Sequence, residues 1–246
     1  MRSRRLQKFV WPLLALASLL TLFAPESESH AGAFIDPQST FGEILIPAKR
    51  WGANDGADVY SNVDPVTLKP TPWNKYDRME FGRIYQCMEL VTRFFHLQFG
   101  HTKSWNVLLA KDTFENHPPG IEAYANGDSA SAGPNWGDIL VFDASRTYPD
   151  GHVAIVYARS RDRVYFVEQN ISLDDGTVIG HDSLAIGKDN RIDNKSGLFV
   201  QNRPTVKGWL HSTSNSGGQS LDIKPMVPGG VWASPLETVS TTDAAL

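Results

Sequence analysis

Two runs of β-forming residues lie close together in the second half of the chain, and they constrain its fold more than any other feature. His152–Ala158 and Arg163–Gln169 are rich in β-branched and aromatic residues, and only the polar residues 159–162 separate them. Two such runs with a short polar connection predict an antiparallel β-hairpin. Further strands are expected at three apolar runs, Asp138–Phe142, Leu198–Asn202 and Val206–Leu210.

One helix is expected ahead of these strands, over residues 84–99. The apolar side chains of this segment recur at intervals of three and four, which gathers them on one helical face. These residues are Ile84, Cys87, Met88, Val91, Phe94, Phe95 and Leu97. Gly100 follows, where glycine commonly ends a helix. A second, short helix is expected near Trp105–Ala110. A helix followed by several antiparallel strands indicates the α+β class.

One domain accounts for most of the chain. Its 246 residues, 41% of them apolar, are enough for a single core, and no repeat of fixed period divides them. We expect this domain at residues 34–212, beginning with an aromatic-rich lead-in laid over the core. The Ser- and Gly-rich residues 212–220 predict a flexible linker, so 213–246 is interpreted as a tail. The stub of a further extracellular module is the alternative.

The first 33 residues predict a signal peptide. Four basic residues precede the apolar run Phe9–Ala24, and the small residues Ser29, Ala31 and Ala33 follow it. The alternative is an uncleaved anchor, but the run is short for a bilayer, which needs about 20 residues. We therefore expect a bacterial protein that is secreted, or associated with the cell wall, with no stable membrane insertion after cleavage.

The charge of the chain argues against nucleic acid as a partner. The whole chain carries a net −4, and residues 1–31 hold four basic and two acidic residues, so their removal leaves −6. No basic tract interrupts this acidic balance, and nucleic acids and anionic membranes bind basic surfaces. Neither is therefore an expected partner.

A single cysteine, Cys87, lies near the start of the predicted helix. It has no second thiol with which to form an internal disulfide. Most free cysteines are buried apolar residues, which is one interpretation of Cys87. The other is a nucleophile, because the amide groups at a helix N-terminus lower a thiol pKa and can hold an oxyanion.

A thiol nucleophile requires a base, and the predicted hairpin offers His152. In the register that pairs Val156 with Val164 and Ala154 with Phe166, His152 faces Glu168 across a five-residue loop. A slip by one residue would separate the two side chains onto opposite faces. The alternative is that the histidine is a solvated turn residue and the glutamate a surface charge.

Four blocks of sequence, in this order, resemble the CHAP family of papain-like cysteine amidases and peptidases, which are related to the NlpC/P60 group. The blocks are Tyr85-Gln86-Cys87-Met88-Glu89-Leu90-Val91, Gly137-Asp138-Ile139-Leu140-Val141-Phe142, Gly151-His152-Val153-Ala154-Ile155-Val156 and Glu168-Gln169-Asn170. They fall within residues 45–212. The resemblance implies a papain-like fold in which an N-terminal helix carries the cysteine and packs on an antiparallel sheet.

The same resemblance implies roles for individual residues. Cys87 would be the nucleophile and His152 the base. Glu168 would orient the histidine, Asn170 would assist, and Gln86 would help to shape the oxyanion site. The segment Gly208-Trp209-Leu210 resembles the closing strand of the family.

No cofactor and no metal are expected. Some CHAP relatives bind calcium in the lead-in, where this chain has Asp55, Asp58, Tyr60 and Asn62, but their spacing fits no EF-hand loop, and an ordinary turn is the favoured interpretation. His96 and His101 lie five apart and do not share a helical face, so a zinc site is rejected.

These expectations predict a secreted cysteine hydrolase whose substrate is peptidoglycan or its peptides. The bond is either the N-acetylmuramoyl-L-alanine amide or a peptide bond of the stem or cross-bridge. One alternative is an inactive CHAP-like domain that binds wall material or a partner. Another is an amidase of a small amide such as a glutathione–polyamine conjugate. The sequence makes no prediction of oligomeric state.

Overall fold

The computed structural model describes residues 35–36, 41–62, 73–76, 79–103, 105, 107–129, 131–173, 178–201 and 203–216. The predicted signal peptide and all of the predicted tail beyond residue 216 lie outside the described residues. Among the described residues, no helix is both long and apolar enough to cross a bilayer.

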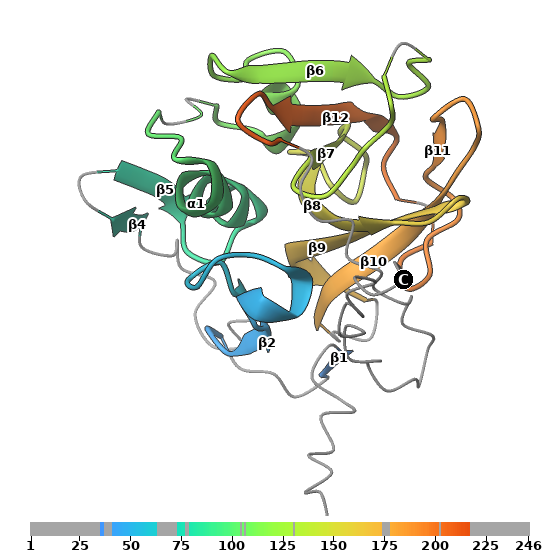
Figure 1. The fold of residues 1–246 in the computed structure, drawn as a ribbon. Coiled ribbons are helices and arrows are strands. Elements are labelled where there is room, and N and C mark those ends of the chain that lie inside the picture. The colour runs from blue at the N-terminus through green and yellow to red at the C-terminus, as the bar shows by residue number, and fades with distance from the viewer. Residues whose placement is uncertain are drawn as a thin grey trace, which may run out of the picture. The chain divides into compact units, whose positions relative to one another are not determined.

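An eight-stranded antiparallel sheet is the centre of the fold (Figure 1). Its strands are β1 (Ile35–Asp36), β6 (Ile121–Ala125), β7 (Ile139–Phe142), β8 (His152–Arg159), β9 (Arg163–Ser172), β10 (Val178–Ile186), β11 (Ile192–Asp193) and β12 (Val206–Ser212). The order across the sheet is β1-β10-β9-β8-β7-β12-β6, and β11 pairs with β10. The sheet curls, so that its two faces enclose separate groups of apolar side chains.

Strand β8 contributes to both cores because successive side chains point to opposite faces. Val153, Ile155 and Tyr157 join the core that contains the helix. Ala154 and Val156 face a second core, shared with β7, β9, β10, β11 and β12. Burial on both faces explains why these strands are continuous apolar runs in the sequence instead of alternating ones.

Within the described residues the one α-helix is α1 (Cys87–Phe99), which packs against β8, β9 and the nearby strand β5 (Met79–Arg83). It ends as expected at Gly100, whose φ of 69° is left-handed and whose N–H donates to the carbonyl of His96. It begins three residues later than the apolar spacing predicts. Tyr85 has a φ of 48° and Gln86 is extended, so neither is helical. Cys87 is consequently the first helical residue.

The lead-in covers the helix with short elements. Strands β2 (Ile44–Ile46) and β3 (Val59–Tyr60) form one pair, and β4 (Trp73–Tyr76) pairs with β5. Between β2 and β3, the 3-10 helix η1 (Ala48–Trp51) places the fully buried Trp51 against Phe94, with ring centroids 5.0 Å apart. The described part of this segment contributes Trp51 to the core, although its short strands carry no clear signal in the sequence.

Two predicted elements are wrong. The short helix is the 3-10 helix η2 (Ala110–Thr113), not a helix over Trp105–Ala110. Of the run Leu198–Asn202, Asn202 lies outside the described residues and 198–201 is not a strand, because the N–H groups of Leu198, Phe199 and Val200 all donate to the carboxylate of Asp182 instead of to a neighbouring strand. Strands β6 and β10 were not predicted.

The predicted hairpin is present as β8 and β9, but its register differs from the expected one. Val156 pairs with Phe166, not with Val164, and a bulge separates Val156 from Ala158. The connection is also shorter than the five residues expected, since the strands end and begin at Arg159 and Arg163. Near His152 the register is displaced by two residues. An even displacement keeps each side chain on its face, so His152 and Glu168 still share one.

Gly151, which immediately precedes β8, is required by its backbone conformation. Its φ is 72°, and an added Cβ would lie 2.7 Å from both the carbonyl oxygen of Phe142 and the Cβ of Lys111. A left-handed backbone alone costs a residue with a side chain about 1–2 kcal/mol. We expect Gly151→Ala to lower the free energy of unfolding by more than that, measured by chemical denaturation.

Gly100→Ala is the matched control, because Gly100 has a φ of 69° and open space around its missing Cβ. This variant should lose only the part of the free energy of unfolding that comes from the left-handed backbone. Equal losses in the two variants would contradict a steric role for Gly151.

Candidate active site

The fold brings the first residue of α1 to the start of β8. Cys87 is buried, and its thiol lies close enough to the ring of His152 and to the backbone N–H groups of Val153 and Met88 for each of them to lower its pKa. The first intrahelical bond of α1 runs from the Leu90 N–H to the Gln86 carbonyl. The N–H groups that precede it, including that of Cys87, have no acceptor within the helix.

These surroundings favour the thiolate of Cys87. Burial alone raises the pKa of its thiol, but the charge of His152, the hydrogen bond with its ring and the two backbone N–H groups together outweigh burial. The pKa of Cys87 is therefore held below its usual value. The thiolate, whose fraction a depressed pKa increases, is the form that attacks a carbonyl carbon.

His152 is held between the thiol and a carboxylate. Its Nε2 lies 3.0 Å from Oε2 of Glu168, which leaves Nδ1 for the thiol of Cys87. An ionised carboxylate only accepts hydrogen bonds, so Nε2 carries a proton. Burial lowers the pKa of His152, but the charges and hydrogen bonds of Cys87 and Glu168 raise it to about 9. The opposite shifts of the two pKa values favour a thiolate beside an imidazolium.

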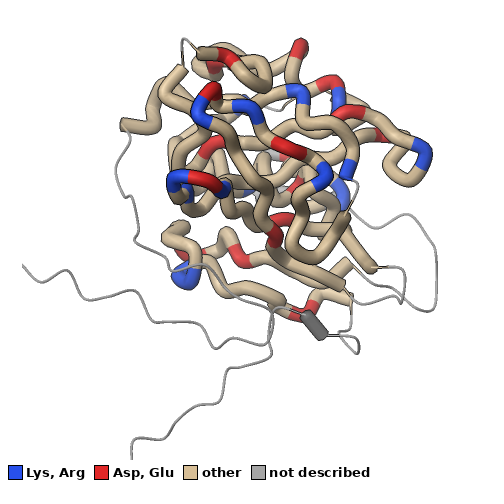
Figure 2. The backbone as a smooth tube through the Cα atoms, turned by 90° about the vertical axis from the view of Figure 1, so that its right-hand side faces the viewer, with Lys and Arg blue, Asp and Glu red and all other residues tan. Residues whose placement is uncertain are grey.

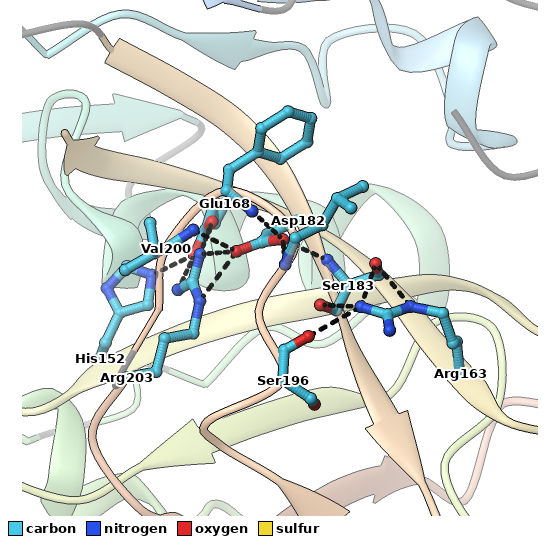
Figure 3. Close-up of polar contacts among 10 residues, drawn as sticks. His152, Arg163, Glu168, Asp182, Ser183, Ser196, Val200 and Arg203 are labelled. Atoms are coloured by element: carbon cyan, nitrogen blue, oxygen red, sulfur yellow. Dashed lines mark hydrogen bonds and ion pairs between the residues drawn. The ribbon is translucent and has the colours of Figure 1, made fainter. Parts of the chain in front are cut away.

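Glu168 is fully buried and remains ionised. Burial raises its pKa, yet the charge of Arg203 and the hydrogen bonds from His152 and Arg203 lower it to about 2. The guanidinium donates to both carboxylate oxygens, with Nη1 2.9 Å from Oε2 and Nη2 2.6 Å from Oε1 (Figure 3). Sequence analysis did not identify Arg203, because an arginine in an irregular segment before a proline usually lies at the surface.

Gln86 and Asn170 meet each other rather than the histidine. The side-chain amide of Asn170 donates to Oε1 of Gln86 at 2.7 Å, and its oxygen accepts from Nδ2 of Asn62 at 2.6 Å. Asn170 also has a left-handed φ of 65°, a conformation that asparagine tolerates. The structure therefore brings together Cys87, His152 and Glu168, and fixes Gln86 beside them through Asn170.

Gln169, which sequence analysis also passed over, ties β9 to the start of α1. Its Nε2 donates to the carbonyl of Gln86 at 3.2 Å and to the buried Glu89 at 3.1 Å. Its Oε1 accepts the backbone N–H of Tyr60 at 2.8 Å. These bonds hold the N-terminus of the helix, and with it Cys87, against the strand that carries Glu168.

The polar side chains considered for a metal have other contacts. Asp58 accepts the N–H of Ala48 at 2.8 Å, and Asp55 forms an exposed ion pair with Lys49. His96 contacts the carbonyl of His101, whose own ring bonds to the Ser212 hydroxyl. In the part of the chain that the structure describes, no cluster of three or more His, Cys, Asp or Glu side chains is arranged to hold a metal.

Comparison with known proteins identifies a family for the central segment. Residues 76–170 match the family profile described as CHAP domain. A search of curated protein sequences finds no match.

Two solved structures are similar over part of the chain. "The crystal structure of Ly7917" is 15% identical and aligns 52% of this chain with 53% of that one, at a TM-score of 0.36. "Crystal structure of a wild type endolysin LysIME-EF1" is 15% identical and aligns 61% of each chain, at a TM-score of 0.35. The chain thus spans between half and two thirds of the length of these structures.

The ionisation of Cys87 can be measured directly, because it is the only cysteine and its thiolate absorbs near 240 nm. We expect the difference in absorbance between wild type and Cys87→Ser to titrate below the ordinary thiol pKa of about 8.5. His152→Ala should raise the midpoint, since burial is then opposed only by backbone N–H groups.

His101→Ala is a suitable control, because His101 contacts Phe95 and Ser212 near the opposite end of α1. Its midpoint should equal that of wild type. A wild-type midpoint at or above the ordinary thiol value would contradict the ion pair.

Proposed function

We propose that this chain, which belongs to the CHAP domain family through residues 76–170, hydrolyses amide bonds of bacterial peptidoglycan with Cys87 as its nucleophile. The observation that carries the proposal is the continuous contact from Cys87 to His152 to Glu168. A nucleophile, a base and a group that orients the base are the parts that covalent acyl transfer requires.

In the proposed reaction the thiolate of Cys87 attacks the carbonyl carbon of the amide and forms a tetrahedral oxyanion. As this species collapses, the C–N bond breaks and the His152 imidazolium donates its proton to the leaving nitrogen. The acyl group then remains on sulfur as a thioester. Neutral His152 next removes a proton from water, which attacks the thioester and releases the carboxylic acid. The proton on the imidazole and the negative charge on sulfur are thereby restored.

The oxyanion is assigned to the N-terminus of α1. The N–H of Cys87 lies at the positive end of the helix, and fixed donors of this kind stabilise a developing negative charge without reorganising. The side chain of Gln86 precedes it and is held by Asn170. Gln86 is therefore proposed to form the wall of this site, with Asn170 as its support.

Peptidoglycan is proposed as the substrate on two grounds. The match to the CHAP domain supports a peptidoglycan hydrolase family. The N-terminal sequence predicts export to the compartment where the cell wall is found. Figure 2 displays acidic and basic positions intermixed along the described backbone, an arrangement that favours no polyanionic substrate. The bond is the muramoyl–alanine amide or a peptide bond of the stem or cross-bridge.

Incubation of the purified protein with peptidoglycan tests this proposal, with released fragments identified by mass spectrometry. We expect cleavage by wild type and a loss of more than about 10³-fold in Cys87→Ala and His152→Ala, because each removes a group of the reaction. Glu168→Gln should lose less, since it retains one oxygen for His152. The fragment masses identify the bond.

If wild type and Cys87→Ala bind cell walls equally and neither releases fragments, an inactive wall-binding domain is favoured instead. Cleavage by Cys87→Ala would refute the thiol mechanism.

The rate should depend on pH in a bell shape. The ion pair forms as pH rises through the lowered pKa of Cys87, and it is lost as pH rises through the pKa of His152 at about 9. Activity should therefore be high at neutral pH and fall above about pH 9, measured as kcat/KM on a soluble wall fragment. A rate that keeps rising well above the pKa of His152 would contradict the role of the imidazolium as acid.

A further inference from the structure

Arg203 is a buried cation outside the residues that define the family motifs. It lies in the irregular segment before β12, and its side chain is 1% exposed. Its guanidinium carbon is 5.1 Å from the ring centroid of Phe166 and 5.7 Å from that of Phe142. A charge buried between two aromatic rings is costly unless all of it is paired.

Two carboxylates share this guanidinium. Besides its two bonds to Glu168, Arg203 donates to Oδ2 of Asp182 from Nε at 3.1 Å and from Nη2 at 2.8 Å. Oε2 of Glu168, which accepts from Nη1, is also the atom that contacts His152. The chain of contacts therefore continues beyond Cys87 and His152, from Glu168 to Arg203 and Asp182. Figure 3 shows the part that begins at His152.

Asp182, on β10, sets the position of Arg203. Its Oδ1 accepts the N–H groups of Leu198 and Phe199, and its Oδ2 accepts that of Val200. The segment leading to Arg203 is thus fixed by the same carboxylate that binds the guanidinium. The backbone that leads to Arg203 and the guanidinium of Arg203 are therefore both held by Asp182.

We propose that Arg203 and Asp182 are positioning residues of the hydrolytic site, which lock the rotation of the Glu168 carboxylate and keep it ionised so that it can hold His152. This inference rests on the proposed function. Free rotation about the last side-chain bond of Glu168 would move its Oε2 away from Nε2 of His152. Bidentate donation by a planar guanidinium fixes both oxygens at once, which a single point charge does not.

The other ionisable groups near Glu168 do not replace Arg203. His181 on β10 is close enough to be affected by the charge of Glu168, but burial lowers its pKa to about 4, so it is neutral at the pH of interest. Tyr157 on β8 lies near Asp182 and Tyr165, and burial raises its pKa well above the usual value. Arg203 is therefore the cation that balances Glu168 and Asp182 in this cluster.

The test compares kcat, KM and the pH profile of Arg203→Met and Asp182→Asn with those of wild type. Arg203→Met leaves two buried carboxylates side by side, which raises the pKa of one of them. The acid limb of the pH profile, where the rate rises with pH, should then move up by about one pH unit or more. The kcat should fall about 10- to 100-fold at nearly constant KM. Asp182→Asn removes a negative charge, so the basic limb, set by His152, should move down.

Arg163→Met is the matched control. Arg163 is a partly buried arginine of the same region, but it bonds to Ser183 and Ser196 and not to Glu168 (Figure 3). Both of its pH limbs should coincide with those of wild type, whatever it loses in stability. If the limbs of the pH profile also shift in Arg163→Met, the effect comes from a general loss of packing in this region, and the inference is overturned.

Circular dichroism and thermal melting establish the folded fraction of every variant. If Arg203→Met does not fold, Arg203→Lys and Asp182→Asn decide the question. The lysine retains the charge without the bidentate geometry, so its acid limb should stay near that of wild type while kcat falls.

Unchanged limbs in Asp182→Asn together with wild-type kcat in Arg203→Lys would overturn the inference. Failure of the proposed function has a different signature, because wild type itself would then release no wall fragments.

Discussion

The contact between His152 and Glu168 is the interaction on which the rest of the site depends. It joins two side chains that are both withdrawn from water, at a separation of 3.0 Å. A buried carboxylate without partners would take up a proton, and a buried imidazole would lose one. Each is kept charged by its other neighbour, Glu168 by Arg203 and His152 by Cys87. Cys87 at the helix start is therefore the outermost member of a series of contacts that reaches Arg203 beside Phe142 and Phe166 of the second core.

The end of β9 organises this arrangement through three consecutive residues. Glu168 points to His152 and Arg203, Gln169 points to the opposite face and holds the start of α1, and Asn170 bonds to Gln86. The alternation of side chains along a strand makes it possible for adjacent residues to hold His152 and the start of α1 separately. The relative position of His152 and Cys87 is thus fixed by one strand rather than by the loops around it.

Sequence patterns predicted the elements that hold Cys87, His152 and Glu168 and missed much of what supports them. The spacing around Cys87 located α1, and the runs near His152 and Glu168 located β8 and β9, because both signals are local. The register was wrong by two residues, because neither the short connection between the strands nor the bulge after Val156 has a sequence signature, yet the period of two preserved the shared face. Arg203 was missed because its partners, Asp182 and Glu168, lie 21 and 35 residues away in the sequence. No periodicity reports a pairing of that kind.

The position of Asn170 gives a physical reason for the spacing of the Glu168-Gln169-Asn170 block. By simple alternation Asn170 would point to the same face as Glu168 and would compete for the space beside His152. Its left-handed φ of 65° turns the chain away at that point, and the side chain reaches Gln86 and Asn62 instead. Asparagine is one of the few residues that adopts this conformation readily and also offers both a donor and an acceptor. Asn170 therefore interrupts the regular alternation of side chains within β9 and supports Gln86, and His152 is left with a single oriented carboxylate.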